Sequence, residues 1–202
     1  MSSTIAVVDY GMGNLRSVSK ALEHVVEDGQ RVIVSSDASE IADAERVVFP
    51  GQGAARDCMK QLKDLKLDEV VLHAAHEKPF LGICMGMQVL MSHSEENQGI
   101  DCMGLYAGDV RAFSDEKLAT QMHSLKIPHM GWNEVSHKQM HPLWSDIKEN
   151  SRFYFVHSYY VDPEDKLLVA GTTEYGIEFV SAIARDNVFA VQFHPEKSAH
   201  DG

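Results

Sequence analysis

The sequence has few cysteines and no long hydrophobic run, and each shortage excludes a class of protein. Its three cysteines, Cys58, Cys84 and Cys102, cannot all pair with one another in disulfides. The longest apolar runs, such as residues 5–8 and 47–49, are far shorter than the roughly 20 residues that span a bilayer. The opening Met-Ser-Ser-Thr-Ile has neither the basic nor the apolar segment of a secretory signal. We therefore expect a soluble, cytoplasmic protein with no membrane partner.

Positive charge is also scarce. Lys and Arg number 18 against 30 Asp and Glu, which gives a formal net charge of −12. This sign opposes binding to nucleic acid by general electrostatics, so we expect no nucleic-acid partner. By contrast, 44% of the 202 residues are hydrophobic, enough for a substantial core, and no linker rich in Pro, Gly or Ser divides the chain. We predict a single domain over residues 1–202.

Apolar segments alternate with helical patterns in the first half of the chain. Strands are predicted over residues 4–9, 31–34, 46–49 and 79–83. Helices are predicted from the spacing of Leu15, Val18, Leu22 and Val25, of Ala55, Cys58, Leu62 and Leu65, and of Met87, Leu90 and Met91. In this pattern Cys58 is a small core residue. The alternation predicts an α/β fold with a parallel sheet and helices on both faces.

The second half of the chain has a different sequence pattern. Short β-like segments are predicted over residues 152–160, 166–172, 177–184 and 188–193. We expect them to extend the sheet with antiparallel strands. Residues 114–126 are the least regular stretch and are predicted to form a loop.

Cys84 is the candidate nucleophile. It lies between Gly82 and Gly86, where a predicted buried strand turns into a helix. This pattern is the thiol counterpart of the G-x-S-x-G nucleophile elbow, in which small flanking residues permit a sharp turn. The turn would leave the thiol at a helix N-terminus, where the dipole favours a thiolate. A buried structural cysteine is an equally good interpretation of this motif taken alone.

His194 and Glu196 are the candidate base and its orienting carboxylate. Both follow the predicted strand 188–193, and Pro195 favours an extended His194 with the two side chains on the same side. Parallel sheets carry their sites at the carboxyl ends of the strands, which would bring His194 to Cys84. The tripeptide alone would be an ordinary strand-ending turn. Together the two motifs predict a Cys-His-Glu triad.

Residues 50–53, Pro-Gly-Gln-Gly, form a second glycine-rich turn after a strand. Acyl transfer needs N–H donors aimed at the developing oxyanion. The backbone N–H groups of Gln52 and Met85 would supply two of them. A plain connection between a strand and a helix is the alternative for this turn.

Two further patterns are weaker. Residues 11–16 lie where a dinucleotide fingerprint would, but Arg16 occupies the position of its third glycine, so NAD is rejected. The histidine pairs with metal-like spacing are His73 with His76 and His137 with His141. No carboxylate or cysteine cluster joins either pair in sequence, so we interpret them as surface histidines. We expect neither a metal nor an organic cofactor.

Residues 82–88, Gly-Ile-Cys-Met-Gly-Met-Gln, together with residues 193–196, Phe-His-Pro-Glu, resemble the class I, triad-type glutamine amidotransferases. The resemblance implies a flavodoxin-like α/β fold and hydrolysis of glutamine to glutamate and ammonia by Cys84, His194 and Glu196. It further implies that the ammonia passes to a synthase domain or partner.

Within this family, residues 9–15, 129–133 and 194–198 resemble the glutaminase subunits of imidazole glycerol phosphate synthase, over essentially the whole chain. That branch implies a cyclase partner in histidine biosynthesis, which makes imidazole glycerol phosphate and AICAR. The cyclase is a (β/α)8 barrel of roughly 250 residues, which cannot fit inside this chain, so a heterodimer is expected.

The resemblance also assigns further residues. The implied glutamine contacts are Gly53, Gln88, Glu96, His157, Ser158 and Tyr159, and the implied interface positions are Asn14, Trp132, Tyr154 and Lys197. Trp132 would anchor the interface from a loop, with an aromatic that caps the core as the alternative. The oxyanion turn departs from the family, which more usually has valine where this chain has Gln52.

Two rival functions differ in class. The nearer is another class I glutaminase, of the vitamin B6 or anthranilate type, which residues 9–15 and 129–133 disfavour. The more distant is a cysteine hydrolase or redox protein of the DJ-1 kind on a similar scaffold. Gln88 and the His194–Glu196 motif disfavour that one.

Overall fold

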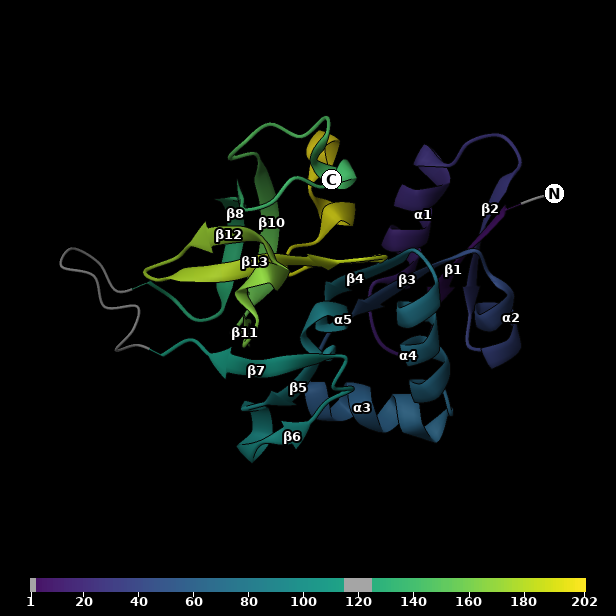
Figure 1. Cartoon of the computed structure of the whole chain (residues 1–202), viewed down its shortest axis with the longest axis horizontal. Helices are drawn as coiled ribbons and strands as arrows, with labels where there is room; N and C mark the ends of the chain where they lie inside the picture. The colour runs from purple at the N-terminus through teal and green to yellow at the C-terminus, as the bar shows by residue number, and fades with distance from the viewer. Residues whose placement is uncertain (1–2, 115–124) are drawn as a thin grey trace.

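The computed structural model describes residues 3–114 and 125–202, so the loop expected over residues 114–126 lies mostly outside the described residues (Figure 1). The helices are α1 Leu15–Val25, α2 Ala38–Asp43, α3 Ala55–Asp64, α4 Asp68–Glu77 and α5 Met85–Gln88. The strands are β1 Ser3–Val8, β2 Gln30–Ser35, β3 Arg46–Gly51, β4 Phe80–Cys84, β5 Met91–Ser94, β6 Ile100–Asp101, β7 Tyr106–Ala112, β8 His129–Glu134, β9 Ser136–His137, β10 Arg152–His157, β11 Tyr159–Pro163, β12 Val169–Glu174, β13 Glu178–Arg185 and β14 Val188–Val191. Short 3₁₀ helices are η1 Glu96–Gln98, η2 Pro142–Trp144, η3 Lys166–Leu168, η4 Pro195–Lys197 and η5 Ala199–Asp201.

A large mixed sheet runs through the molecule in the order β2-β1-β3-β4-β14-β13-β11-β7-β5-β6. From β2 to β14 neighbouring strands are parallel, as the alternation of strands and helices predicts. From β14 onward, β13, β11 and β7 are each added antiparallel to the strand before them in this order, and β12 and β9 continue from β13. The next strand, β5, is parallel to β7, and β6 is antiparallel to β5. This arrangement confirms the predicted α/β class with an antiparallel extension.

The parallel strands are buried on both faces. In β1, Ile5 and Val7 belong to one core cluster, whereas Ala6 and Val8 belong to the other. Helix α1 packs on the first cluster through Val18, and α2 to α5 contribute to the second, so helices cover both faces (Figure 1). Burial on both sides explains why these strands are continuous apolar runs without polar alternation.

A second, two-stranded sheet pairs β8 with β10, and it corrects the loop expected at Trp132. In β8 the buried and exposed positions alternate, but with His129 buried and Met130 and Trp132 exposed. The strand therefore inverts the usual hydrophobic pattern, which is why its alternation is not visible in the sequence. Trp132 lies directly opposite Tyr154 of β10.

Two predicted β segments differ from the structure in where their strands begin and end. The segment 152–160 divides at Ser158, because β10 pairs with β8 while β11 joins the large sheet. The segment 166–172 begins as the 3₁₀ helix η3 and becomes strand β12 only at Val169. A sequence pattern of period two does not reveal which sheet a strand will enter.

The helix after Cys84 is shorter than predicted. It ends at Gln88, and Met91 already begins β5. Leu90 and Met91 are nevertheless fully buried, so their spacing reflects core packing on a turn and a strand rather than one helix face. A helix of four residues aligns few peptide dipoles, so the expected dipole support for a thiolate at Cys84 is small.

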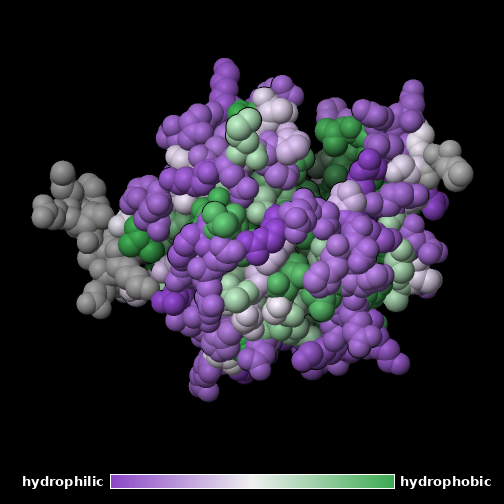
Figure 2. All heavy atoms as spheres, viewed as in Figure 1, coloured by the Kyte–Doolittle hydropathy of each residue, from purple (hydrophilic) through white to green (hydrophobic). Residues whose placement is uncertain are grey.

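The surface in Figure 2 is mostly hydrophilic, with hydrophobic side chains gathered in separate patches. One patch borders a hollow of about 550 Å³ between α1, through Leu22 and Val25, and the C-terminal residues Ala199 and Gly202. Among the described residues, no helix combines the length and the hydropathy needed to cross a membrane.

Candidate active site

Cys84 stands on a strained turn at the carboxyl end of β4. Its backbone has φ 55° and ψ −106°, an uncommon conformation for a residue with a side chain. Such strain persists only where the surrounding structure enforces it, and it is typical of nucleophile elbows. The neighbouring strands enforce it here, since Gly51 of β3 is the register partner of Cys84.

The two glycines around Cys84 are required by close contacts. A Cβ atom on Gly86 would lie 1.8 Å from the carbonyl oxygen of Phe49, and one on Gly82 would lie 2.9 Å from the Cβ of Ala190. Neither site has room for a side chain, because both neighbours belong to the central sheet. The spacing of the G-x-C-x-G motif therefore follows from packing of the turn against β3 and β14.

His194 and Glu196 form a buried pair beyond the end of β14. The Nδ1 atom of His194 lies 2.9 Å from Oε1 of Glu196, and their side chains are 1% and 2% exposed. His194 is extended, as predicted, and η4 begins at Pro195. The backbone is tied to β10, because the N–H of His194 donates to the carbonyl of Tyr154 at 2.9 Å. The imidazole is thus held from two sides.

The surroundings of His194 favour its charged form. Burial alone lowers the pKa of His194, but the hydrogen-bonding capacity and charge of Cys84 and Glu196 outweigh burial and raise it to about 9. Since the carboxylate accepts the Nδ1 proton, Nε2 is the atom left for Cys84. Nε2 is buried and has no well-aligned partner among the described residues. An imidazole beside a thiol is the usual general base for a cysteine nucleophile.

A cavity of about 450 Å³ opens beside Cys84. Its lining residues are Gln52, Gly53, Cys84, Met85, Gln88, Glu96, Pro128, Val156, His157, Ser158, Tyr159, His194 and Lys197. The structure therefore brings together the nucleophile, the base, both oxyanion candidates and all the glutamine contacts implied by the sequence. Glu196 lies behind His194 and does not line this cavity. Pro128 and Val156 were missed, because apolar wall residues carry no chemical signature in a sequence.

The wall at residues 157–159 is fixed by neutral histidines. Burial lowers the pKa of His129 to about 4. Burial also lowers the pKa of His157 to about 3, although the hydrogen bond to the carbonyl of Tyr159 acts to raise it. The Nδ1 of His157 lies 2.7 Å from the carbonyl oxygen of Tyr159, which only accepts, so Nδ1 carries the proton. Nε2 of His157 then accepts from Nδ1 of His129 at 2.9 Å. Both ring nitrogens of His157 are thus engaged in hydrogen bonds within the protein.

Glu96 also lines the cavity, and its carboxylate is fixed by a backbone hydrogen bond. Its Oε2 accepts from the backbone N–H of Ala55 at 2.6 Å, at the first residue of α3. A carboxylate held there suits a ligand that carries an ammonium group.

Three of the predicted interface residues form one contiguous cluster at the surface. Trp132 is 45% exposed, and its ring meets that of Tyr154 at a centroid distance of 6.2 Å. The ammonium of Lys197 lies 6.0 Å from the ring centroid of Tyr154. Lys197 also lines the cavity, so the cluster adjoins the candidate site. Asn14 is the residue before α1, without a side-chain capping hydrogen bond, and its role stays a prediction.

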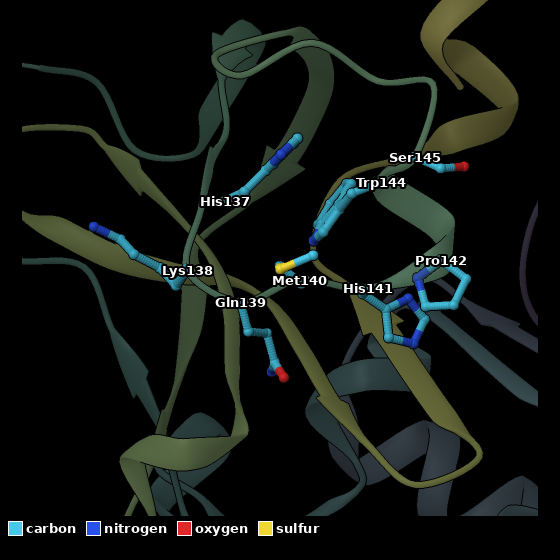
Figure 3. A pocket seen from close by; sticks show the side chains of 8 residues that line it. All are labelled: His137, Lys138, Gln139, Met140, His141, Pro142, Trp144 and Ser145. Carbon is cyan, nitrogen blue, oxygen red and sulfur yellow. The ribbon is translucent and has the colours of Figure 1, made fainter.

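Size alone does not identify the active site. A larger cavity of about 760 Å³ follows β9, with His137, Met140, His141 and Trp144 among its walls (Figure 3). Its histidines serve packing: His137 stacks on Trp144 at 4.3 Å, and Nδ1 of His141 accepts from the N–H of Leu143. His73 and His76 are exposed on α4, as predicted, whereas His137 and His141 are only partly exposed.

The described part of the chain has no evident metal centre. Across residues 3–114 and 125–202, no group of three or more His, Cys, Asp or Glu side chains is placed to hold a metal ion. The side chains that meet at Cys84 offer the chemistry of a thiol, an imidazole and a carboxylate.

The sequence profile of the class-I glutamine amidotransferases matches residues 6–202. Imidazole glycerol phosphate synthase subunit HisH of Dechloromonas aromatica is 60% identical over 200 residues, which cover 98% of this chain and 92% of that protein. The protein of the same name from Hydrogenovibrio crunogenus is 53% identical over 198 residues, with 98% and 91% covered.

Solved structures share the fold at lower identity. PurLQS from Thermotoga maritima superposes with a TM-score of 0.68 at 21% identity, covering 97% of this chain and 89% of that one. A glutamine amidotransferase from the same organism gives a TM-score of 0.61 at 16% identity, with 100% and 79% covered. At these identities the likeness concerns the fold alone.

Proposed function

Because the chain belongs to the class I glutamine amidotransferase family, we propose that Cys84, His194 and Glu196 are the catalytic triad of its glutaminase reaction. Its function is that of the glutaminase subunit of imidazole glycerol phosphate synthase in histidine biosynthesis. The observation that carries the triad is geometric. A thiol on a strained elbow shares a small cavity with a buried imidazole, which a buried carboxylate holds from behind.

The triad performs the reaction in two stages. The Cys84 thiolate attacks the carboxamide carbon of glutamine, and His194 protonates the departing nitrogen, so that ammonia leaves and a glutamyl thioester forms. His194 then takes a proton from water, which attacks the thioester and releases glutamate and the free thiolate. Glu196 keeps Nδ1 protonated throughout, so that Nε2 carries both proton transfers. The backbone N–H groups of Gln52 and Met85 stabilise the oxyanion in each stage.

The remaining cavity residues would bind glutamine. Both hydrogens of the Gln88 amide nitrogen are committed, to the carbonyl of Tyr159 at 3.2 Å and to Oε1 of Gln192 at 2.9 Å. Its oxygen is therefore the atom left to accept from the substrate. Glu96 offers a carboxylate for the α-ammonium group, and Gly53 with the backbone of residues 157–159 completes the pocket.

The ammonia acceptor would be a separate cyclase chain in the cytoplasm. The relatives named above are called subunits, which supports a complex with a partner chain. We infer that residues 1–202 act as one amidotransferase domain, since both core clusters pack on the same central sheet. The partner would dock on the cluster of Trp132, Tyr154 and Lys197, with Asn14 nearby on the same rim.

Glutaminase assays with and without the partner test this function. We expect glutamine hydrolysis by the isolated chain to be slow, and to rise when the cyclase and its phosphoribosyl substrate are added. Strong hydrolysis by the isolated chain that the cyclase leaves unchanged would contradict the coupled function. Glutamine is the expected substrate, with asparagine as the matched control.

Glu196→Gln should retain the fold but lower glutaminase activity, by less than the loss of the nucleophile does. An orienting group costs less than the nucleophile in comparable triads. Because the carboxylate is one of the causes that raise the pKa of His194, its loss should lower that pKa. The alkaline limb of the pH–rate profile should therefore move to lower pH. A loss equal to that of Cys84→Ala, or an unshifted profile, would argue against the orienting role.

Trp132→Ala should weaken the complex by roughly 30-fold in Kd, as loss of about 2 kcal/mol at an interface anchor would. Because Trp132 is exposed, the Tm of the isolated chain should change little. Trp144→Ala is the matched control: this tryptophan is only 7% exposed, so its loss should lower the Tm. Titration calorimetry with the cyclase and thermal unfolding separate the two effects. A large fall in Tm for Trp132→Ala would show instead that Trp132 caps the core.

A further inference from the structure

Gln192 is a buried polar residue in the centre of the molecule that belongs to no motif in the sequence. It follows β14, two residues before His194, and is fully buried. Its backbone N–H donates to the carbonyl of Ser181 at 2.9 Å, which fixes the main chain against β13. It is not among the residues that line the cavity beside Cys84, so it has no place for direct contact with glutamine.

The orientation of the Gln192 amide is determined by a chain of hydrogen bonds that begins at a backbone carbonyl. The oxygen of Tyr159 can only accept, so the Gln88 atom 3.2 Å away must be the amide nitrogen. That nitrogen also lies 2.9 Å from the Gln192 amide, whose facing atom must therefore be its oxygen, Oε1. The other end of the Gln192 amide is then Nε2, which lies 3.5 Å from the sulfur of Cys84.

An N–H group at this position acts differently on the two forms of the thiol. A neutral sulfur is a weak acceptor, whereas hydrogen bonds to an ionised partner are roughly twice as strong as neutral ones. The donor therefore favours the thiolate over the thiol. It also restricts rotation of the side chain, since the sulfur lies within hydrogen-bonding distance of this amide.

We infer that Gln192 is a positioning residue for Cys84, whose side-chain N–H holds the sulfur as a thiolate aimed at the substrate cavity. Gln88 has a second task in this arrangement, because it sets the direction of the Gln192 amide while it faces the cavity. The inference rests on the proposed role of Cys84 as the nucleophile. The side-chain N–H of Gln192 stabilises the thiolate, which the dipole of the short helix α5 stabilises only weakly.

Gln192→Glu is the sharpest test. It keeps the shape of the side chain and an oxygen for Gln88 to donate to, but it replaces the N–H facing the sulfur by oxygen. Gln192→Met removes the donor without adding charge. In a Cys58→Ala, Cys102→Ala background, only Cys84 remains to react with iodoacetamide. We expect its alkylation at pH 7 to slow by about tenfold in both variants, and its pH dependence to move to higher pH.

Turnover of glutamine by the assembled synthase gives a second readout. Because Gln192 lies outside the cavity, kcat should fall by about tenfold while KM for glutamine changes by less than about twofold. A rise in KM at unchanged kcat would assign Gln192 to substrate binding and overturn the inference. Unchanged alkylation profiles in both variants would overturn it as well.

Gln139→Glu is the matched control. The amide of Gln139 donates to the carbonyls of Leu168 and Ala184, away from the cavity beside Cys84, and the same change there should leave alkylation and kcat unchanged. Thermal unfolding is measured for every variant. Loss of the fold in both Gln192 variants would make this residue a packing residue and overturn the inference. If glutaminase activity survived Cys84→Ser, the proposed triad would fail, whereas the alkylation result would still report on the contact between Gln192 and Cys84.

Discussion

Cys84→Ala is expected to abolish glutamine-dependent synthesis by the assembled enzyme, with a loss of at least about a thousandfold. The residue supplies the sulfur that forms the thioester, and no other described thiol lines the cavity to replace it. Synthesis from added ammonium salt should remain within about twofold of the wild type, because ammonia supplied directly bypasses the thiol. Both activities are measured on the same purified complex by formation of imidazole glycerol phosphate.

Cys58→Ala is the matched control for this experiment. Cys58 is a fully buried core residue on α3 that does not line the cavity, and its loss should leave both activities in place. If Cys84→Ala removed the ammonia-dependent activity too, Cys84 would have a structural role in the complex. If glutamine-dependent synthesis survived, the nucleophile would have to be sought elsewhere.

The sequence was sufficient to predict the parts of the site that depend on local chemistry. Cys84 between two glycines requires a tight turn, and the structure gives the reason, since a side chain at Gly86 would overlap the backbone of β3. The apolar run of β1 predicts burial on both faces, and both cores are present. These signals act over a few residues, so a sequence contains them in full.

The rest of the fold and of the candidate site depends on contacts between segments that are distant in the sequence. Strand β8 carries a buried His129 and an exposed Trp132, and only its pairing with β10 accounts for both. Gln192 has no motif of its own, and its importance arises from Gln88, which lies 104 positions away in sequence. Helices α2 and α4 were not predicted. The start of α2 nevertheless has a local signal, because Asp37 caps it by accepting from the N–H groups of Ser39 and Glu40.

Gly86→Ala is expected to be the most destabilising single-methyl change in the protein's centre. The new Cβ would lie 1.8 Å from the carbonyl oxygen of Phe49, well inside van der Waals contact, and the obstacle is backbone rather than a flexible side chain. This overlap can be removed only if β3 and the turn at Cys84 move apart. We expect the free energy of unfolding to fall by about 3–5 kcal/mol. The Tm should fall by roughly 10 °C.

Gly171→Ala is the matched control, because Gly171 is also buried in the sheet but its Cβ would lie no closer than 3.1 Å to a neighbour, the side chain of Val135. That change should alter the free energy of unfolding by less than about 1 kcal/mol. Denaturant titration of both variants measures the difference. Since the same movement would displace Cys84 from His194, any folded fraction of Gly86→Ala should also lose reactivity of Cys84 toward iodoacetamide. Equal free energies of unfolding for the two variants would mean that the turn at Cys84 accommodates a side chain at little cost. Its glycines would then not be required by packing.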